Sequence, residues 1–240
     1  ISDCLVGSEM CIRDSNVSGK IWDNSNYRKT KRNFREFIKM CKKISGDEIV
    51  IASHNIGKIK EFRDIFKNYG YILTSSSDYN LEEPEENGST FAENALIKAM
   101  ATMQGTGKVS LSDDSGLCIK ELNNDPGIFS ARWAGVNKDF NLAMVKVEKK
   151  LLEKGLKSSK AYFYCALAVA WPDKSYKIYE GAVHGNLRFP PKGKLGFGYD
   201  PIFIPNGFDI SFGEMSPSRK HSMSHRAEAF RKLKKELLDD

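Results

Sequence analysis

The stretch AYFYCALAVAW, Ala161–Trp171, decides the fold class. It is a near-continuous apolar run, and such a run is typical of a strand that is buried on both faces of a sheet. The sequence Pro172-Asp173-Lys174 follows it as a turn, and Ser175–Val183 then alternates as a partner strand would. The sequence therefore predicts an antiparallel hairpin.

Further strands and helices flank this hairpin. Short apolar runs predict strands at Glu48–Ala52, at Val109–Leu111 running into SDDSG, and at Gly116–Leu122 leaving it. Turn-forming residues predict a turn at Asn123–Gly127 and a loop at Gly193–Pro205. The helical spacing of Ile59, Phe62, Phe66 and Tyr69 predicts a helix that stops at Gly70. Further helices are predicted after a capping box at Thr90–Glu93, over Phe140–Leu152, and after a cap at Ser224. Because strands and helices mix without a strict repeating order, we predict an α/β fold with a mixed sheet.

The charge is unevenly distributed along the chain. Residues 1–45 contain ten Lys or Arg and five Asp or Glu, so they carry five of the six net positive charges. We expect these residues to be a basic N-terminal extension, disordered or artefactual, and residues 46–240 to form the folded domain. A basic run such as Arg28–Lys43 is more often a solvated surface than a nucleic-acid contact. The sequence therefore gives no case for a nucleic-acid partner.

Cysteine usage and hydropathy indicate the compartment. The five cysteines are odd in number and have no CxxC spacing, which argues against a disulfide framework and a structural zinc site. No apolar run approaches the roughly 20 residues that span a bilayer, so no membrane association is expected. We predict a cytoplasmic protein.

A polar loop between a buried strand and a helix contains Ser53, Asn55 and Lys58. The N-terminus of a helix has free backbone N–H groups and the positive end of the helix dipole, and both favour a phosphate group. Lys58 adds a full charge, and the other two side chains can donate hydrogen bonds. Taken alone the pattern is weak, because polar loops with a lysine precede many helices.

Asp113 and Asp114 are adjacent carboxylates, followed by Ser115 and Gly116, at the end of a predicted strand. Mg²⁺ prefers such hard oxygen ligands and needs only one or two carboxylates when substrate phosphates complete its shell. The acidic stretch Glu82–Glu86 is a candidate source of a further ligand. The alternative is an exposed turn, since Asp, Ser and Gly all favour turns.

Two further patterns favour a base-binding site. In Gly196–Pro201 (GFGYDP), glycines flank an aromatic ring whose face can stack on a base, although an aromatic core residue in a tight loop is the commoner case. Lys220, His225 and Arg226 place cations near the start of the last helix, where they oppose its dipole. That arrangement is more readily understood if acceptors lie nearby.

Taken in order, SxNxxKxxE, TFxENAxxKA, DDSGL followed by PGxxSAR, FGYDPIF and SHR make the chain resemble the inosine triphosphate pyrophosphatase family. The resemblance covers about Glu48 to Leu238. It implies a bent mixed sheet with two lobes around a nucleotide cleft, and hydrolysis of ITP, dITP or XTP to the monophosphate and pyrophosphate. One departure is Ser53-His54, where bacterial members commonly have Thr-Gly.

The resemblance also implies a Mg²⁺ cofactor, a homodimer and roles for single residues. Catalysis would fall to Asp114, which orients or deprotonates the attacking water, with Asp113 and Lys58 beside it. Glu86 and Asp114 would hold the metal. Substrate binding would involve Ser53, Asn55, Lys58, Ser115, Phe197, Gly198, Tyr199, Asp200, Lys220, His225 and Arg226, with Phe197 stacking on the purine and the last four reading its edge.

Base chemistry agrees with those roles. A 6-oxo purine presents acceptors at O6 and N7, whereas adenine presents an amino donor at position 6. Lys and Arg donors therefore fit hypoxanthine and clash with adenine. Two alternatives remain open at this point. One is a Maf-type pyrophosphatase acting on modified or pyrimidine nucleotides, and the other is a nucleotide-binding module without turnover.

Overall fold

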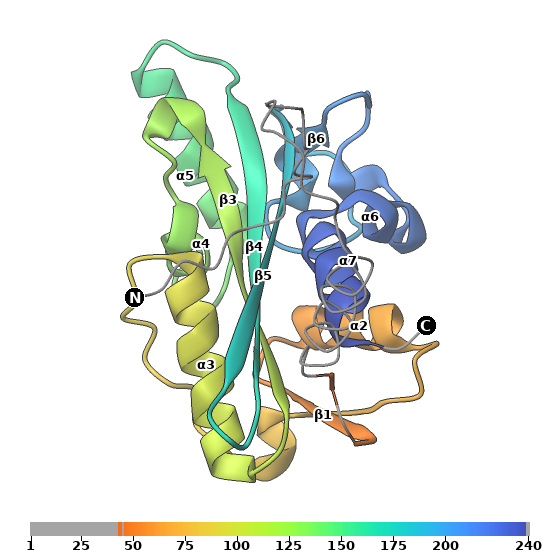
Figure 1. Ribbon diagram of the computed structural model, residues 1–240. Coiled ribbons are helices and arrows are strands. Elements are labelled where there is room, and N and C mark those ends of the chain that lie inside the picture. Colours follow the sequence, from red (N-terminus) through yellow and green to blue (C-terminus); the bar gives the residue numbers. More distant parts are fainter. Residues whose placement is uncertain (1–42, 45, 239–240) are drawn as a thin grey trace, which may run out of the picture. The chain divides into compact units, whose positions relative to one another are not determined.

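The computed structural model describes residues 43, 44 and 46–238, and Figure 1 shows their arrangement. Apart from Lys43 and Ile44, the predicted N-terminal extension lies outside the described residues. Among the residues that are described, no helix has both the length and the apolar character needed to cross a membrane.

A six-stranded sheet with the order β2-β1-β3-β4-β5-β6 forms the centre of the fold. β1 (Glu48–Ile51) runs parallel to β2 (Ile72–Ser75) and to β3 (Ser110–Ile119). From β3 onward the pairing is antiparallel, through β4 (Lys160–Ala170), β5 (Tyr176–Leu187) and β6 (Phe203–Pro205). The predicted α/β class, mixed sheet and central hairpin are therefore confirmed. The short strand β6 lies inside the stretch predicted as a loop.

The helices agree with the predicted positions. The long ones are α2 (Ile56–Phe66), α3 (Phe91–Thr106), α5 (Phe140–Glu153) and α7 (His225–Leu237). Short helices are α4 (Ser130–Trp133) and α6 (Pro217–Met223), with single 3₁₀ turns at Ser76–Tyr79, Lys120–Leu122, Gly127–Phe129, Asp200–Ile202 and Phe212–Glu214. Ser224 caps α7 as predicted, by accepting from the Ala227 amide.

The N-cap half of the predicted capping box of α3 is formed, and its Glu93 half is directed mainly to Ser89. The Thr90 side chain accepts from the Glu93 amide at 3.1 Å, as expected of an N-cap. The Glu93 carboxylate instead accepts from the amide and hydroxyl of Ser89, one residue before the cap. The helix still begins where the sequence places it.

The acidic pair lies within a strand, and this corrects the prediction of a strand end between two strands. β3 continues through the pair, and Asp113 pairs with Leu167 while Asp114 pairs with Ala166 of β4. The long apolar strand β4 offers a backbone partner along the whole length of β3, which satisfies its N–H and C=O groups better than a loop would. Because side chains alternate along a strand, the two carboxylates point to opposite faces of the sheet.

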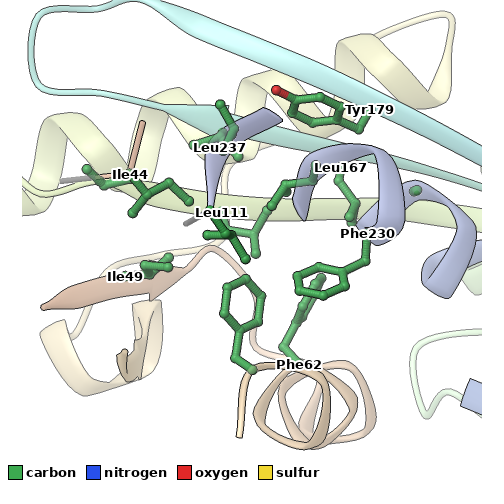
Figure 2. Packing of buried hydrophobic residues seen from close by; sticks show 14 of the residues in the cluster. Ile44, Ile49, Phe62, Leu111, Leu167, Tyr179, Phe230 and Leu237 are labelled. Atoms are coloured by element: carbon green, nitrogen blue, oxygen red, sulfur yellow. The ribbon is translucent and has the colours of Figure 1, made fainter. Parts of the chain in front are cut away.

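Side chains along β4 point alternately to the two faces of the sheet, so the core has one hydrophobic layer on each face. Cys165, Leu167 and Val169 belong to the cluster beneath α2 and α7, part of which is shown in Figure 2. Ala166, Ala168 and Ala170 point to the other face, where α3 packs closely on these small side chains through its own alanines. Figure 1 accordingly shows α3 and α7 on opposite sides of the sheet.

The sheet face that carries α7 has two separate hydrophobic clusters, and each forms the core of one lobe. On β3, Leu111 belongs to the cluster with α2 and α7, whereas Leu117 and Ile119 belong to a cluster with α5 and β6. These three side chains share one face of the strand, so Asp113 and Ser115 lie between the clusters. The sequence that separates the two hydrophobic centres is therefore the DDSG motif itself.

The contacts of Lys43 and Ile44 give a prediction about the N-terminal boundary. Ile44 is buried and its amide donates to Leu237 O at 3.1 Å, while the Trp171 indole donates to Lys43 O at 3.3 Å. We propose that the folded domain begins at Lys43, three residues before its predicted start at residue 46. Deleting residues 1–42 should leave the melting temperature unchanged. Deleting residues 1–45 should cost about 1.5–3 kcal/mol through lost burial of Ile44.

Urea unfolding of the two truncated chains and of Ile44→Ala measures this difference. A deletion of residues 1–45 that is as stable as the deletion of residues 1–42 would restore the boundary to residue 45.

Candidate active site

A cleft of about 360 Å³ opens between the two lobes. Its walls come from the start of α2, the loop before α3, the middle of β3, the loop before β6 and the starts of α4 and α7. Of the predicted site residues, all except Asp113 line it: Ser53, Asn55, Lys58, Glu86, Asp114, Ser115, Phe197, Gly198, Tyr199, Asp200, Lys220, His225 and Arg226. The fold thus brings together side chains from five separate parts of the sequence.

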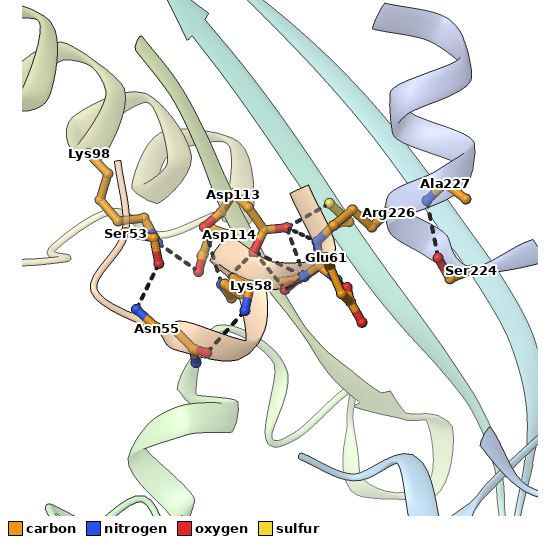
Figure 3. Close-up of polar contacts among 12 residues, drawn as sticks. Ser53, Asn55, Lys58, Glu61, Lys98, Asp113, Asp114, Ser224, Arg226 and Ala227 are labelled. Carbon is orange, nitrogen blue, oxygen red and sulfur yellow. Dashed lines mark hydrogen bonds and ion pairs between the residues drawn. The ribbon is translucent and has the colours of Figure 1, made fainter. Parts of the chain in front are cut away.

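The loop after β1 forms an ordered turn at one end of the cleft. Ser53 Oγ accepts from the Asn55 amide at 3.1 Å, and Asn55 Oδ1 caps α2 by accepting from the Lys58 amide at 3.2 Å (Figure 3). These bonds leave the Ser53 hydroxyl hydrogen and the Asn55 side-chain NH₂ to donate into the cleft. His54 is directed elsewhere, since its Nε2 lies 2.8 Å from Leu81 O and the ring does not line the cleft.

Asp113 lies beneath the cleft and gathers several donors. Its carboxylate is 2.5 Å from Lys58 Nζ, accepts from Arg226 Nε at 3.1 Å and Nη2 at 3.2 Å, and accepts from Cys165 Sγ at 3.0 Å. Burial alone would raise the pKa of Asp113, but the Arg226 and Lys58 cations hold it well below its usual range. Asp113 is therefore an ionised anchor for two cations, and its predicted part in catalysis stays a prediction.

Asp114 has a different environment on the opposite face. Its Oδ1 accepts from Lys98 Nζ of α3 at 3.3 Å, while its buried Oδ2 has no hydrogen-bond partner. Burial raises the pKa of Asp114, and the nearby Lys98 and Lys58 cations only partly oppose that effect. An unpartnered buried carboxylate oxygen is costly unless a ligand uses it.

The residues around Asp114 fit a hard divalent cation. Lys98 Nζ also donates to Glu86, so Asp114 and Glu86 share one ammonium, and Glu83 lines the same part of the cleft. No group of three or more His, Cys, Asp or Glu with metal-binding spacing occurs in the part of the chain that the structure describes. Mg²⁺ does not require one, because it is commonly held by one or two carboxylates together with substrate phosphates.

The loop between Gly196 and Asp200 closes the other end of the cleft. Asp200 Oδ2 accepts from the Phe197 amide at 2.8 Å and from Lys220 Nζ at 2.6 Å. Gly196 has a φ of +74°, and a Cβ there would lie 2.0 Å from Asp200 Oδ2, so this tight loop requires glycine. Phe197 is half-buried with Lys220 Nζ 4.8 Å from its ring centroid.

Tyr199 belongs to the core as much as to the cleft. It is buried, its ring packs edge-on against Phe140, and its hydroxyl donates to Ser130 O at 2.9 Å. Its contacts therefore tie the aromatic loop to α4, and its predicted contact with the substrate stays a prediction.

Glu61 connects the cations at the base end of the cleft, and the motif analysis gave it no role. It accepts from Lys220 Nζ at 3.0 Å and from Arg226 Nη1. Burial opposes ionisation of Glu61, but Arg226 and Lys220 lower its pKa far below the usual value. The signal was present, because Glu61 is the last residue of SxNxxKxxE and directly precedes the core residue Phe62.

Arg226 and His225 differ in the groups that they offer to the cleft. Arg226 is buried, and its Nε, Nη1 and Nη2 all donate to Asp113, Glu61 or Ser115. His225 is also buried, and its Nδ1 has no partner. Burial, followed by the Arg226 and Lys220 cations, holds the pKa of His225 well below its usual value, so the ring is neutral. The predicted reading of a purine edge by these residues stays a prediction.

Lys98 and Arg132 are further cleft residues that the sequence did not single out. Lys98 lies on the buried side of α3 between Ala95 and Ala99, and a buried lysine in a helix is rarely without a carboxylate partner. Arg132 of α4 donates from Nη2 to Glu86 O at 2.6 Å, across the opening of the cleft. Both occur in the quoted motifs, as the Lys of TFxENAxxKA and the Arg of PGxxSAR.

The sheet, the N-terminus of α2 at the cleft and the paired buried charges define an α/β protein with a two-ended cleft, polar at one end and aromatic at the other. A family model described as the Ham1 family matches residues 49–236. This chain belongs to the Ham1 family, and the resemblance inferred from its motifs is confirmed.

Curated relatives match most of the chain. It is 50% identical over 194 residues to the dITP/XTP pyrophosphatase of Caulobacter vibrioides, covering 81% of this chain and 100% of that protein. It is 47% identical over 193 residues to the dITP/XTP pyrophosphatase of Rhodospirillum centenum, covering 80% and 95%.

Solved structures have the same fold. A HAM1 protein from Coxiella burnetii superposes with a TM-score of 0.72 at 36% identity, and the Staphylococcus aureus Ham1 protein with 0.69 at 39% identity. Each comparison covers 78% of this chain and 96% of the other.

Proposed function

We propose that the chain is a nucleoside triphosphate pyrophosphatase that hydrolyses deaminated purine nucleotides such as ITP, dITP and XTP. Its products are the monophosphate and pyrophosphate. The observation that carries the proposal is the two-ended cleft: a helix N-terminus and an unpartnered Asp114 oxygen at one end, and Phe197 with Lys220 at the other. The names of the curated relatives support the same substrate class.

In this proposal a water molecule attacks the α-phosphorus and the bond to the β-phosphate oxygen breaks. Asp114 orients the water and takes up its proton at the carboxylate that burial makes more basic. The N-terminus of α2, together with the remaining donors of Ser53 and Asn55, receives the departing pyrophosphate. Asp114 and Glu86 would hold Mg²⁺, which would supply positive charge near the developing oxyanion.

The base end of the cleft would select the purine. Phe197 stacks on the ring, and Lys220, fixed by Asp200 and Glu61, donates toward O6 or N7. Adenine presents an amino donor in place of O6 and meets a donor clash. Sites built on such hydrogen bonds discriminate by roughly 10⁴–10⁵.

A nucleotide panel tests the proposal. Pyrophosphate release should be fastest with ITP, dITP or XTP, weak with GTP, ATP and UTP, and absent in the presence of EDTA. Faster release from UTP or a modified pyrimidine nucleotide would favour a Maf-type activity. Binding of ITP without pyrophosphate release would favour a nucleotide-binding module.

The oligomer and the compartment are also proposals. We propose a cytoplasmic homodimer without a nucleic-acid partner, supported by the family resemblance, the scattered cysteines and the nearly neutral charge of residues 46–240. Sedimentation of the full chain tests the dimer.

Lys220→Met gives a prediction about base selection. It should lower kcat/KM for ITP by about tenfold to 150-fold, since a charged hydrogen bond contributes roughly 1.5–3 kcal/mol. ATP, which lacks the acceptor, should lose little. The measurement is the ratio of kcat/KM values for the two nucleotides in parent and variant. An equal loss for both would assign Lys220 to the phosphates or to the framework.

A further inference from the structure

Lys98 contacts both carboxylates of the proposed metal site. Its ammonium donates to Glu86 and, at 3.3 Å, to Asp114 Oδ1, so it lies on both carboxylates that would hold a metal. The side chain is only 6% exposed and reaches this place from α3, on the sheet face opposite Arg226. The two carboxylates and one buried ammonium leave a net charge of −1 in this group.

The arrangement around Asp114 shows that Lys98 satisfies the carboxylates only in part. Asp114 Oδ1 has the ammonium, whereas Asp114 Oδ2 is buried without any partner. A lysine offers a point charge with three donors, while a divalent cation binds several oxygens at once. Lys98 therefore neutralises part of the negative charge of Glu86 and Asp114, and Asp114 Oδ2 is still available to bind a further cation.

We propose that Lys98 is an internal counter-ion, which holds Glu86 and Asp114 together without metal and competes with a free divalent cation for them. The inference rests on the proposed metal site and deepens it. A metal that arrives alone must displace an ammonium or bind beside it, and like charges at this distance repel. A metal that arrives on a triphosphate brings its own anionic ligands, and the phosphates offer Lys98 new acceptors. The protein would thus bind metal and nucleotide together.

Other cations of the cleft do not compete in this way. Lys58 is bound to Asp113 and acts on Asp114 only at longer range, and Lys220 is paired with Asp200 and Glu61, so neither bridges Glu86 and Asp114 as Lys98 does. Lys220→Met is therefore a matched control: it removes one buried positive charge from the same cleft, but not from between these two carboxylates.

The experiment is a Mn²⁺ titration of the nucleotide-free full chain, followed by the electron paramagnetic resonance signal of free Mn²⁺. Parent, Lys98→Met, Lys98→Gln and Lys220→Met are compared, and melting temperatures are recorded with and without Mn²⁺. Gln keeps an uncharged N–H donor on a side chain one atom shorter, and it serves if the Met variant does not fold.

We expect Lys98→Met and Lys98→Gln to bind Mn²⁺ roughly tenfold more tightly than the parent, because the repulsion is removed. Their melting temperatures should fall without metal and rise more with Mn²⁺ than that of the parent. Unchanged or weaker Mn²⁺ binding in both Lys98 variants would overturn the counter-ion. Equal tightening in Lys220→Met would also overturn it, since the effect would then be general to the cleft.

Pyrophosphate release from ITP by the parent separates this inference from the proposed function. Turnover with unchanged Mn²⁺ affinity in the Lys98 variants would overturn the counter-ion alone. Tighter Mn²⁺ binding in those variants without any turnover by the parent would support the counter-ion and overturn the function. Failure of every variant to bind millimolar Mn²⁺ would overturn both the counter-ion and the metal site.

Discussion

Pyrophosphate release from ITP should fall about a thousandfold or more in Asp114→Asn, a loss typical of removing a general base or metal ligand. The amide keeps the volume of the carboxylate and leaves the pairing of β3 with β4 intact. It removes the charge that would hold the metal and the basic oxygen that would accept the proton of water. Asp114 Oδ2, which has no partner in the nucleotide-free protein, is the atom whose loss should matter most.

The fold of this variant should be largely preserved. Asp114 Oδ2 has no partner to lose, and Oδ1 loses only its 3.3 Å ion pair with Lys98, which keeps Glu86 as a partner. Burial also makes the charge of Asp114 unfavourable, which offsets part of that loss. Circular dichroism and the melting temperature provide the check, and exposed Asp209→Asn is the matched control for activity. Activity within a few-fold of the parent would exclude Asp114 as metal ligand and base.

Asp113→Asn, unlike Asp114→Asn, should cause a large loss in the free energy of unfolding. The substitution leaves Arg226 and Lys58 with one carboxylate fewer in a buried network. Removing one partner of a buried ion pair typically costs about 3–5 kcal/mol, because the remaining charge is uncompensated. Urea unfolding at neutral pH measures this loss. A loss below about 1 kcal/mol would show that Asp113 is not the anchor that its contacts indicate.

A second substitution and the pH provide controls for this prediction. Lys58→Met in the Asp113→Asn background removes the unpaired cation and should recover part of the stability. The pKa of Asp113 is lower in the folded than in the unfolded chain, so its stabilising effect is present above the unfolded value of about 4. That effect is lost as the pH falls through the lower folded value, and parent and variant should therefore converge in acid. A constant difference across this range would contradict the assignment.

The parts of the fold with strong periodic patterns were predictable from the sequence. The apolar run of β4 and its turn at Pro172 identified the hairpin, and Thr90 and Ser224 marked the starts of two helices. The strand β2 (ILTS) was missed because it is short and mostly half-exposed. The residues of the DDSG motif favour turns and so predict a break between two strands, whereas pairing with β4 overrides that local preference.

The candidate site was predictable as a set of residues but not as a set of contacts. Family motifs brought Ser53, Asp114 and Phe197 together correctly around one cleft. The sequence alone does not show which charged side chains meet in the fold. The pairing of Asp113 with Arg226 and of Asp114 with Lys98 is therefore seen only in the structure. For the same reason Glu61 and Lys98 had no assigned role, although both lie in the quoted motifs.

The alternation of side chains along β3 makes Asp113 and Asp114 non-interchangeable, although they are chemically identical neighbours. A deletion or insertion of one residue in β3 before this pair would exchange the two environments, placing Asp113 on the α3 side and Asp114 on the face of Arg226. Neither aspartate can therefore substitute for its neighbour after mutation. Because the pleat of the strand places the two carboxylates on opposite faces of the sheet, each has its own set of contacts. A one-residue shift in the register of β3 would therefore disrupt both sets.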